Sequence, residues 1–204
     1  MVKEALVVAR DILFKEKYFE GFLPAEEYNY IPLITKNFSY HERGDVLEHN
    51  ADLQQIIPYI WIVNPTKKEV FAYKRAGNEN YTEVRLRNKW SCGLGGHIER
   101  QDNGDPIGKG MMRELQEEVK MNSYPTPRIV GYLNDDKGDV ERVHFGVVAL
   151  AETLGPVEKG DEEMAEGRFM SLSEIEQLFG DPENDIENWT KMSWPFVKKY
   201  LSKN

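Results

Sequence analysis

Three glutamates stand close together in the stretch from Met112 to Val119: Glu114, Glu117 and Glu118. In a helix, at roughly 3.6 residues per turn, they share an arc of about 100°, where their negative charges repel one another. Most acidic helix runs are solvated surface faces. The other interpretation is a site for a hard divalent cation, since carboxylate oxygens suit such ions. The acids alone leave both interpretations open.

A glycine-rich segment lies upstream of the acids, with three glycines among residues 93–96. Without a Cβ these residues permit a tight backbone path and the close approach of a ligand. Asp105 is a good N-cap and Pro106 suits the first helical position, so we expect a helix from Pro106 to Met121. Its first N–H groups and its positive dipole end would then lie near the loop.

The predicted helix separates two kinds of side chain. Met112, Leu115 and Val119 are expected to face the core. Arg113 lies at the margin of the acidic side and can pair with Glu117 one turn further on. Such a pair would orient that carboxylate without adding another acid.

Strand signals surround the helix. Residues 56–63 form an apolar run fit for a buried strand, and residues 70–73 complete a hairpin after the Asn64-Pro65 turn. Residues 128–133 and 143–150 predict a second hairpin. Strands on both sides of one long helix indicate mixed α/β layers. The end of the chain predicts a short strand near 168–170, a helix capped by Ser171 or Ser173, and a last helix through 194–201.

The first 50 residues are harder to interpret. Residues 5–8 and 12–14 could form a strand or a short helix, and residues 30–40 have weak helical periodicity. We expect residues 1–50 to be an N-terminal extension packed on a main domain of residues 51–204. The extension could shape a pocket or form a dimer contact, so the sequence leaves open whether the protein is a homodimer.

Composition narrows the class of protein. The 204 residues suit one domain, and 26 Lys plus Arg against 35 Asp plus Glu give a net charge of −9. That charge disfavours nucleic acid and anionic membranes as partners. The single cysteine, Cys92, excludes an internal disulfide framework and fits a reducing compartment. The apolar start is too short for a signal peptide or a membrane span, and we expect a cytoplasmic protein.

The glycine loop, the acid and the helix together resemble the Nudix box of the Nudix hydrolases. The family pattern is Gly, five residues, Glu, seven residues, then Arg-Glu-hydrophobic-x-Glu-Glu-x-Gly-hydrophobic. Gly96 matches the first glycine, Asp105 matches the first acid, and residues 106–112 are the spacer. The resemblance implies a Nudix-type α/β/α sandwich with a mixed sheet over about residues 55–180. The end of the pattern is matched by Arg113, Glu114, Leu115, Glu117, Glu118 and Met121.

Three departures from the family pattern stand out. Eight residues separate Gly96 from Asp105 instead of five, so the loop carries an insertion, placed at residues 100–103. The first acid is Asp instead of Glu, which implies rearranged support of the loop. Lys120 replaces the glycine after the paired glutamates, and Asn122 could cap the helix, which would then run slightly longer than in relatives.

The resemblance also implies a chemistry. In the family the box glutamates hold Mg²⁺ or Mn²⁺, so Glu114, Glu117 and Glu118 would be ligands, with the Gly96 carbonyl as a candidate partner. The ion would neutralise charge on diphosphate oxygens and lower the pKa of an attacking water. The implied reaction is hydrolysis of a pyrophosphate bond in a nucleoside diphosphate linked to another group, with Arg113 beside the catalytic glutamates.

Binding of the substrate phosphates requires positively charged side chains. The stretch 73–90 holds five basic and two acidic residues in an otherwise acidic chain. We expect Arg75, Arg85 and Arg87 to bind phosphate, because an Arg fork suits phosphate oxygens. The alternative is a charged strand edge that binds no ligand.

A further acid is expected late in the chain, because Nudix hydrolases often take a general base or ligand from a late loop. Residues 160–167 offer Glu162, Glu163 and Glu166. The alternative is that all three are solvated.

Four other conspicuous side chains have simpler interpretations. His97 is expected to be structural or to support a ligand, and His144 to be a packed histidine on a strand. Tyr59 and Trp61 share one side of a strand, which favours the core over stacking on a base.

Two rival functions use a similar fold. Isopentenyl diphosphate isomerase places a catalytic cysteine directly before a Gly-His pair, whereas here Gly95 precedes Gly96-His97 and Cys92 lies three positions too early. Non-catalytic Nudix-like modules, which bind nucleotides or partners, commonly lose box glutamates, and this chain keeps all three in the helix. The sequence therefore favours the hydrolase over the binding module.

Overall fold

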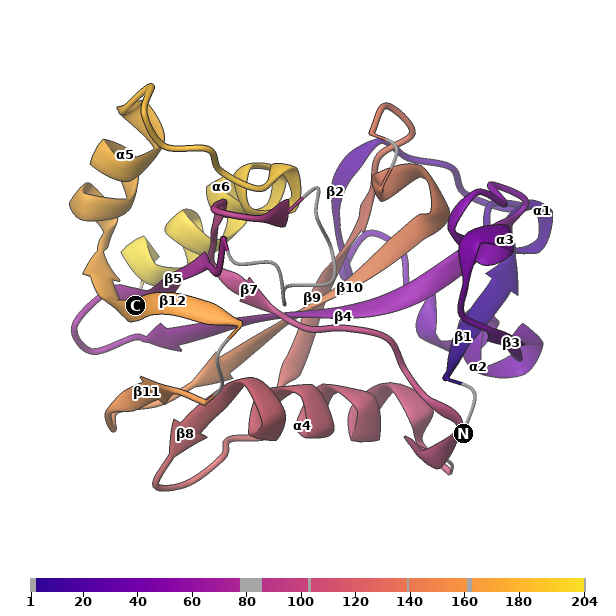
Figure 1. Cartoon of the computed structure of the whole chain (residues 1–204), viewed down its shortest axis with the longest axis horizontal. Helices are drawn as coiled ribbons and strands as arrows, with labels where there is room; N and C mark the ends of the chain where they lie inside the picture. Colours follow the sequence, from indigo (N-terminus) through magenta and orange to yellow (C-terminus); the bar gives the residue numbers. More distant parts are fainter. Residues whose placement is uncertain (1–2, 78–85, 103, 139, 161–162, 204) are drawn as a thin grey trace. The chain divides into compact units, whose positions relative to one another are not determined.

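A computed structural model describes residues 3–77, 86–102, 104–138, 140–160 and 163–203. The fold is mixed α+β with a large mixed sheet, as predicted. The chain divides into two compact units. Both units contain residues of β4 (Leu53–Asn64), α4 (Pro106–Glu118), β9 (Arg128–Asn134) and β10 (His144–Glu152), which Figure 1 labels.

The first unit comprises Met1–Tyr59, Gly95–Met111 and Ile129–Ala149. Its remaining helices and strands are β1 (Glu4–Ala9), α1 (Arg10–Leu13), β2 (Gly21–Pro24), α2 (Ile31–Asn37), β3 (Ser39–Glu42), α3 (Asp45–Glu48) and two short 3-10 helices at Arg100–Asp102 and Glu141–Val143.

Strands β4, β10, β9 and β2 are hydrogen-bonded neighbours in that order. Strand β1 pairs antiparallel with β4 on one side and with β3 on the other, so that Val7 lies opposite both Gln55 and Ser39. Residues 5–8 form a strand and not a helix because β1 lies between two strands, and its apolar run is fully buried.

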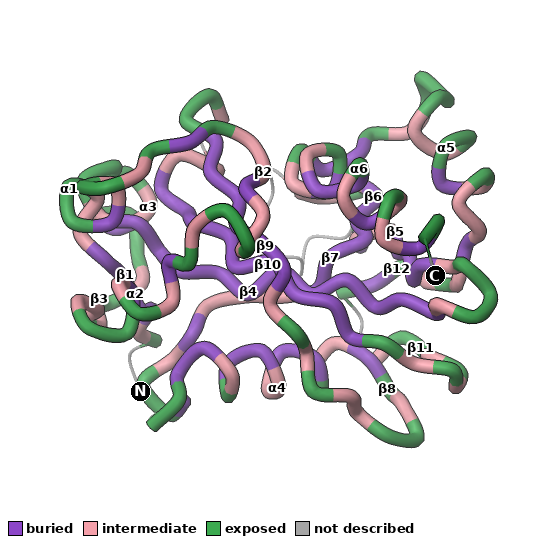
Figure 2. The backbone as a smooth tube through the Cα atoms, turned by 180° about the vertical axis from the view of Figure 1, so that it is seen from behind, coloured by how far each residue is buried: buried purple, intermediate pink, exposed green. Residues whose placement is uncertain are grey.

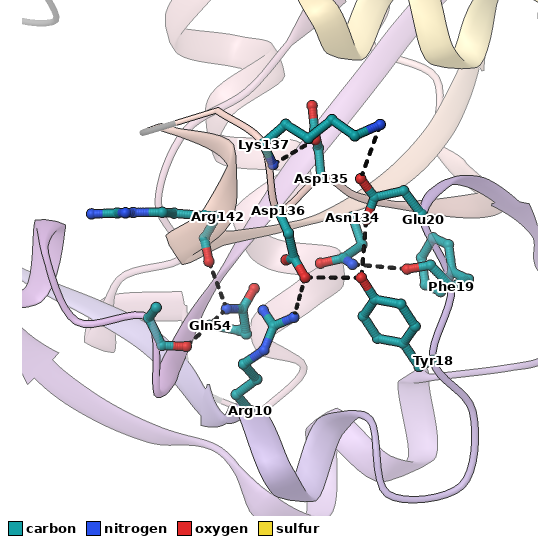
Figure 3. Close-up of polar contacts among 11 residues, drawn as sticks. Arg10, Tyr18, Phe19, Glu20, Gln54, Asn134, Asp135, Asp136, Lys137 and Arg142 are labelled. Atoms are coloured by element: carbon teal, nitrogen blue, oxygen red, sulfur yellow. Dashed lines mark hydrogen bonds and ion pairs between the residues drawn. The ribbon is translucent and has the colours of Figure 1, made fainter.

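Polar contacts tie the N-terminal residues to the end of β9 and to the segment that follows it (Figure 3). The Arg10 guanidinium lies 2.6 Å from Asp136 Oδ2, and the Tyr18 hydroxyl donates to the same oxygen at 2.8 Å. The Asn134 side-chain amide donates to the Phe19 carbonyl at 2.8 Å. The hydrogen bond to Asp136 raises the pKa of Tyr18 to about 12.

The second unit comprises Ile60–Leu94, Met112–Arg128 and Leu150–Asn204. Its remaining helices and strands are β5 (Glu69–Arg75), β6 (Trp90–Ser91), β7 (Gly93–Leu94), β8 (Val119–Met121), β11 (Val157–Lys159), β12 (Met164–Ser171), α5 (Leu172–Gly180) and α6 (Asn188–Lys203).

The predicted hairpin is present: β5 pairs antiparallel with β4, with Val63 opposite Val70, and with β12 on its other edge. Trp61 is buried, as predicted; its ring stacks on Trp194 at 6.2 Å and its Nε1 donates to Ser193 Oγ at 3.1 Å. Tyr59, in the first unit, is also buried. Within the described residues, no helix combines the length and the apolar character that crossing a membrane requires.

Two predictions about α4 were wrong. The helix ends at Glu118 and not at Met121, because residues 119–121 form β8, which pairs with β11 from Val119 opposite Lys159. Met111 is fully buried where Met112 was expected, and Met112 is only partly buried. Among the buried positions of the helix, 107, 111 and 115 follow an i, i+4 row, and buried and exposed positions alternate along the helix in Figure 2.

Gly95 lets the glycine-rich loop lie directly against β4. Its φ is +153°, and an added Cβ would come within 1.8 Å of the Pro58 carbonyl oxygen. That oxygen belongs to the backbone and cannot rotate away. Both the positive φ and the close approach to Pro58 therefore require a glycine at position 95.

We expect Gly95→Ala to lower the free energy of unfolding by about 3 kcal/mol or more, because the variant combines backbone strain with an atomic overlap. Chemical denaturation measures the loss. The control is Gly180→Ala, where an added Cβ meets nothing within 4 Å. Equal stability of the two variants would contradict the tight contact at Gly95.

Helix α5 begins with a capping box, which settles the sequence alternatives in favour of Ser171. The Ser171 side chain accepts from the Glu174 backbone N–H, and Glu174 accepts from the Ser171 backbone N–H at 2.8 Å. Arg168 donates to Glu174 at 2.8 Å. The Arg168 hydrogen bond, followed by those from Ser171, lowers the pKa of Glu174 to about 2.

Because this pKa is lower in the folded state, the Glu174 carboxylate stabilises the fold above its ordinary pKa of 4.5, and this contribution is lost as the pH falls toward about 2. We expect Glu174→Gln to be less stable than wild type at pH 7, with the difference narrowing across that window. Denaturation at several pH values measures it. Glu183→Gln, which removes an exposed carboxylate outside the capping box, is the control. A pH-independent difference for Glu174→Gln would refute the assignment.

Candidate active site

The start of α4 is fixed by the acid that the sequence analysis placed there. Asp105 Oδ1 accepts from the Gly108 N–H at 3.1 Å, and the Asp105 carbonyl accepts from the Lys109 N–H at 2.9 Å. An added Cβ on Gly108 would lie 2.3 Å from Asp105 Oδ2. The prediction that Asp105 caps the helix is confirmed, and a short acid suits this position better than glutamate.

The predicted loop insertion begins with a short 3-10 helix at Arg100–Asp102. Asp102 is buried, and its Oδ2 accepts from the Glu99 N–H at 2.8 Å. Arg100 donates to Glu4 Oε1 at 2.9 Å. The described part of the insertion is therefore anchored, both within the loop and on β1, while Asn103 lies outside the described residues.

Arg113 holds two of the three glutamates. Its Nη1 atom lies 2.7 Å from Glu114 Oε1 and 3.0 Å from Glu117 Oε2. The pair with Glu117 was predicted, and the pair with Glu114 was not. The Glu114 side chain is only 11% exposed, whereas that of Glu117 is 58% exposed. A solvated acidic face would expose both carboxylates, so this interpretation does not fit Glu114.

The end of α4 is held by a glycine that the sequence analysis did not single out. The Gly160 N–H donates to the Glu118 carbonyl at 2.8 Å. An added Cβ on Gly160 would lie 2.7 Å from that oxygen and 2.8 Å from the Glu117 carbonyl oxygen. The backbone that carries Glu117 and Glu118 therefore packs directly on Gly160, and its position depends on a glycine there.

Two of the predicted late acids can be placed in the second unit. Glu163 and Glu166 are exposed, and the Glu163 carbonyl accepts from the Ala76 N–H at 2.8 Å. Glu166 lies opposite Lys74 on β5, next to a shift in the strand register. Glu162 lies outside the described residues. The catalytic roles of Glu163 and Glu166 stay predictions.

Arg75 forms an ion pair with Glu187, a residue that the sequence analysis missed because it carries no motif. Both side chains are largely buried, at 11% and 7% exposed, and Ser91 Oγ donates to Glu187 Oε2 at 2.7 Å. The pair joins β5 to the residue before α6. Arg87 is partly buried and Arg85 lies outside the described residues, so phosphate contacts by all three arginines stay predictions.

Cys92 is buried, and burial, together with the charge of Glu187, raises the pKa of its thiol well above the ordinary value. Its N–H donates to Thr190 Oγ1 at 3.0 Å. A buried thiol held in its protonated form does not suit a catalytic nucleophile or base. The environment of Cys92 therefore agrees with the sequence argument against the isomerase.

Comparison with known proteins identifies the family. Residues 55–190 match the NUDIX domain, which covers more than half of the chain. The chain therefore belongs to the Nudix family, and the predicted resemblance is confirmed.

Similar individual proteins support this assignment. Protein YmaB of Bacillus subtilis (strain 168) is 32% identical over 199 residues, covering 91% of this chain and 93% of that protein. The crystal structure of Tm1382, a candidate Nudix hydrolase, has a TM-score of 0.77 at 27% identity, and the match covers 97% of this chain and 99% of that one. The Francisella tularensis bifunctional NMN adenylyltransferase/ADP ribose pyrophosphatase, solved with AMP and a Mn ion, shares the fold at a TM-score of 0.53 and 13% identity, covering 72% of this chain and 42% of that one.

We expect Gly160→Ala to displace the last turn of α4, because the new methyl group would overlap the backbone of Glu117 and Glu118. The variant should lose about 1–3 kcal/mol of stability. If Glu117 and Glu118 act in hydrolysis, turnover should also fall by about tenfold or more, since small misplacements of reacting groups are costly. Denaturation and steady-state kinetics measure the two effects.

The control is Gly155→Ala, in the segment before β11, where the nearest heavy atom to an added Cβ is Thr153 Oγ1 at 3.7 Å. Wild-type turnover and stability in Gly160→Ala would show that the glycine does not hold the helix end.

Proposed function

We propose that the protein hydrolyses a pyrophosphate bond in a nucleoside diphosphate linked to another group, and that it requires Mg²⁺ or Mn²⁺. Membership of the Nudix family supports a hydrolase that acts on pyrophosphate bonds. The observation that carries the proposal for this chain is the Arg113 contact with both Glu114 and Glu117 in the last turns of α4. The largely buried Glu114 beside the exposed Glu117 supports a built site over a solvated face.

The donor set fits a hard divalent ion. Glu114, Glu117 and Glu118 supply only carboxylate oxygens, the donor type that Mg²⁺ and Mn²⁺ prefer. Arg113 pairs with one oxygen of Glu114 and one of Glu117, which orients both carboxylates. The Gly96 carbonyl is retained as a further proposed ligand. When bound, the ion would neutralise the diphosphate oxygens and lower the pKa of water.

The chain's own groups would complete the reaction. Water attacks phosphorus, the bond from that phosphorus to the bridging oxygen breaks, and a carboxylate accepts the proton from the water. Glu163 and Glu166 are the proposed candidates for this base, because both are exposed acids. Arg75, Arg85 and Arg87 are the proposed phosphate contacts, although Arg75 also holds Glu187.

The substrate is proposed at the level of a class. The Francisella tularensis protein of similar fold is an ADP ribose pyrophosphatase solved with AMP. Its name makes ADP-ribose a reasonable first compound to test. NDP-sugars, dinucleotide polyphosphates, NADH and oxidised nucleotides complete the panel, because the Nudix box does not select among them.

We expect Glu117→Gln and Glu118→Gln each to lower turnover by at least about 100-fold, because each replaces a charged ligand with a neutral amide. The measurement is product release from the best substrate of the panel with Mg²⁺ or Mn²⁺, together with denaturation to confirm folding. The control is Glu158→Gln, an exposed carboxylate on β11 opposite Lys120.

Unchanged turnover in both box variants would refute the site. Tight binding of a nucleotide with no product from any compound of the panel would instead favour the alternative function, a non-catalytic Nudix-like binding module.

A further inference from the structure

A second group of metal-ligand side chains lies wholly in the first unit, apart from the box glutamates in sequence and in chemistry. Glu48, His97 and His144 each offer one ligand atom, and these atoms all lie within 4.8 Å of one another. Glu48 ends α3, His97 follows the glycine-rich loop, and His144 begins β10. The two imidazole rings are 5.6 Å apart and inclined at 69°.

A backbone carbonyl sets the tautomer of His144. Its Nδ1 lies 2.6 Å from the Val140 oxygen. A carbonyl can only accept, so Nδ1 donates and the neutral ring carries its lone pair on Nε2. His144 is 6% exposed, which holds the ring in this orientation.

Gln55 sets the tautomer of His97 in the same way. His97 Nε2 lies 2.8 Å from Gln55 Oε1, and as the amide oxygen accepts, the lone pair of the neutral ring lies on Nδ1. The Gln55 amide nitrogen also lies 3.5 Å from Glu48 Oε1, so one side chain contacts two members of the group. Zinc-binding histidines are typically held by such a hydrogen bond through the other ring nitrogen.

We propose that Glu48, His97 and His144 bind one Zn²⁺ ion. Two imidazole nitrogens and one carboxylate oxygen are a common zinc donor set, whereas Mg²⁺ prefers oxygen donors alone. At the usual Zn–N and Zn–O distances, tetrahedral ligand atoms are roughly 3.3–3.5 Å apart, so the group has to contract by about 1.5 Å at most. Glu48 is partly exposed at the end of a four-residue helix and can supply much of that movement.

Binding would join three segments that are far apart in the sequence. An ion that binds only the folded state stabilises it in proportion to the logarithm of its concentration. The site would therefore tie α3 to the start of β10 and to the glycine-rich loop. The proposal does not depend on the hydrolase activity, because none of its ligands belongs to the α4 glutamates.

The competing interpretation is that the group is only a hydrogen-bonded histidine cluster. A buried histidine with a carbonyl partner is common in protein cores, and His144 was expected to be one. The two interpretations differ in a single measurable property, the binding of zinc to the folded, metal-free protein.

The test uses the full chain, freed of metal by a chelator and titrated with Zn²⁺ in competition with a chromophoric chelator. The background is Glu117→Gln, which weakens the proposed site on α4. We expect one zinc equivalent in this background, and at least a tenfold loss of affinity on adding Glu48→Gln or His144→Gln. At the same zinc concentration, zinc should also raise the melting temperature of the background protein more than that of its Glu48→Gln derivative.

His41→Gln is the matched control, because His41 is an exposed histidine on β3 whose Nε2 contacts Ser39 Oγ at 3.1 Å. The His41→Gln variant should still bind one equivalent of zinc.

Glu48→Gln preserves the shape of a partly exposed side chain, so it serves as the main variant if His144→Gln folds poorly. Failure to bind zinc, or equal affinity in the background protein and Glu48→Gln, would overturn the proposal. Loss of hydrolysis in Glu117→Gln tests the α4 site only.

Discussion

The contact between Arg113 and Glu114 is the interaction on which the candidate active site depends. A carboxylate as little exposed as that of Glu114 is costly unless a cation or several donors replace its water. The guanidinium at 2.7 Å supplies that replacement, and the same nitrogen reaches Glu117. The positive charge of Arg113 thus offsets the repulsion between the glutamates, so that several carboxylates can lie on one face of α4.

Contacts at its two ends set the position of this charged helix. At one end the Asp105 side chain caps α4 over Gly108, and at the other the Gly160 N–H meets the Glu118 carbonyl. A Cβ at Gly108 would overlap the Asp105 carboxylate, and a Cβ at Gly160 would overlap the backbone of Glu118. Helix ends held by a short side chain or by a backbone group are less free to move than ends held by long side chains. The glutamates consequently project from a segment whose length and ends are both defined.

Local spacing predicted much of this structure. The cap at Asp105, the serine cap of α5, which the sequence left open between Ser171 and Ser173, the hairpin of β4 with β5 and the Arg113–Glu117 pair each involve residues near one another in the sequence. The features that were missed depend on distant residues. Helix α4 stops at Glu118 because residues 157–159 offer a partner strand, and the group around His97 joins three remote segments. The periodicity of the sequence within a single helix or strand does not encode contacts between such distant segments.

The direct passage from α4 into β8 affects which length changes the chain can tolerate. Val119 already pairs with Lys159, so no spare residue separates Glu118 from the strand. One inserted residue would turn the helix by about 100° relative to β8, or shift the strand register and exchange its two faces. In the loop before α4, by contrast, Arg100–Asp102 folds into a turn of its own. Among related sequences, length variation should therefore concentrate before the helix and be absent at the junction after it.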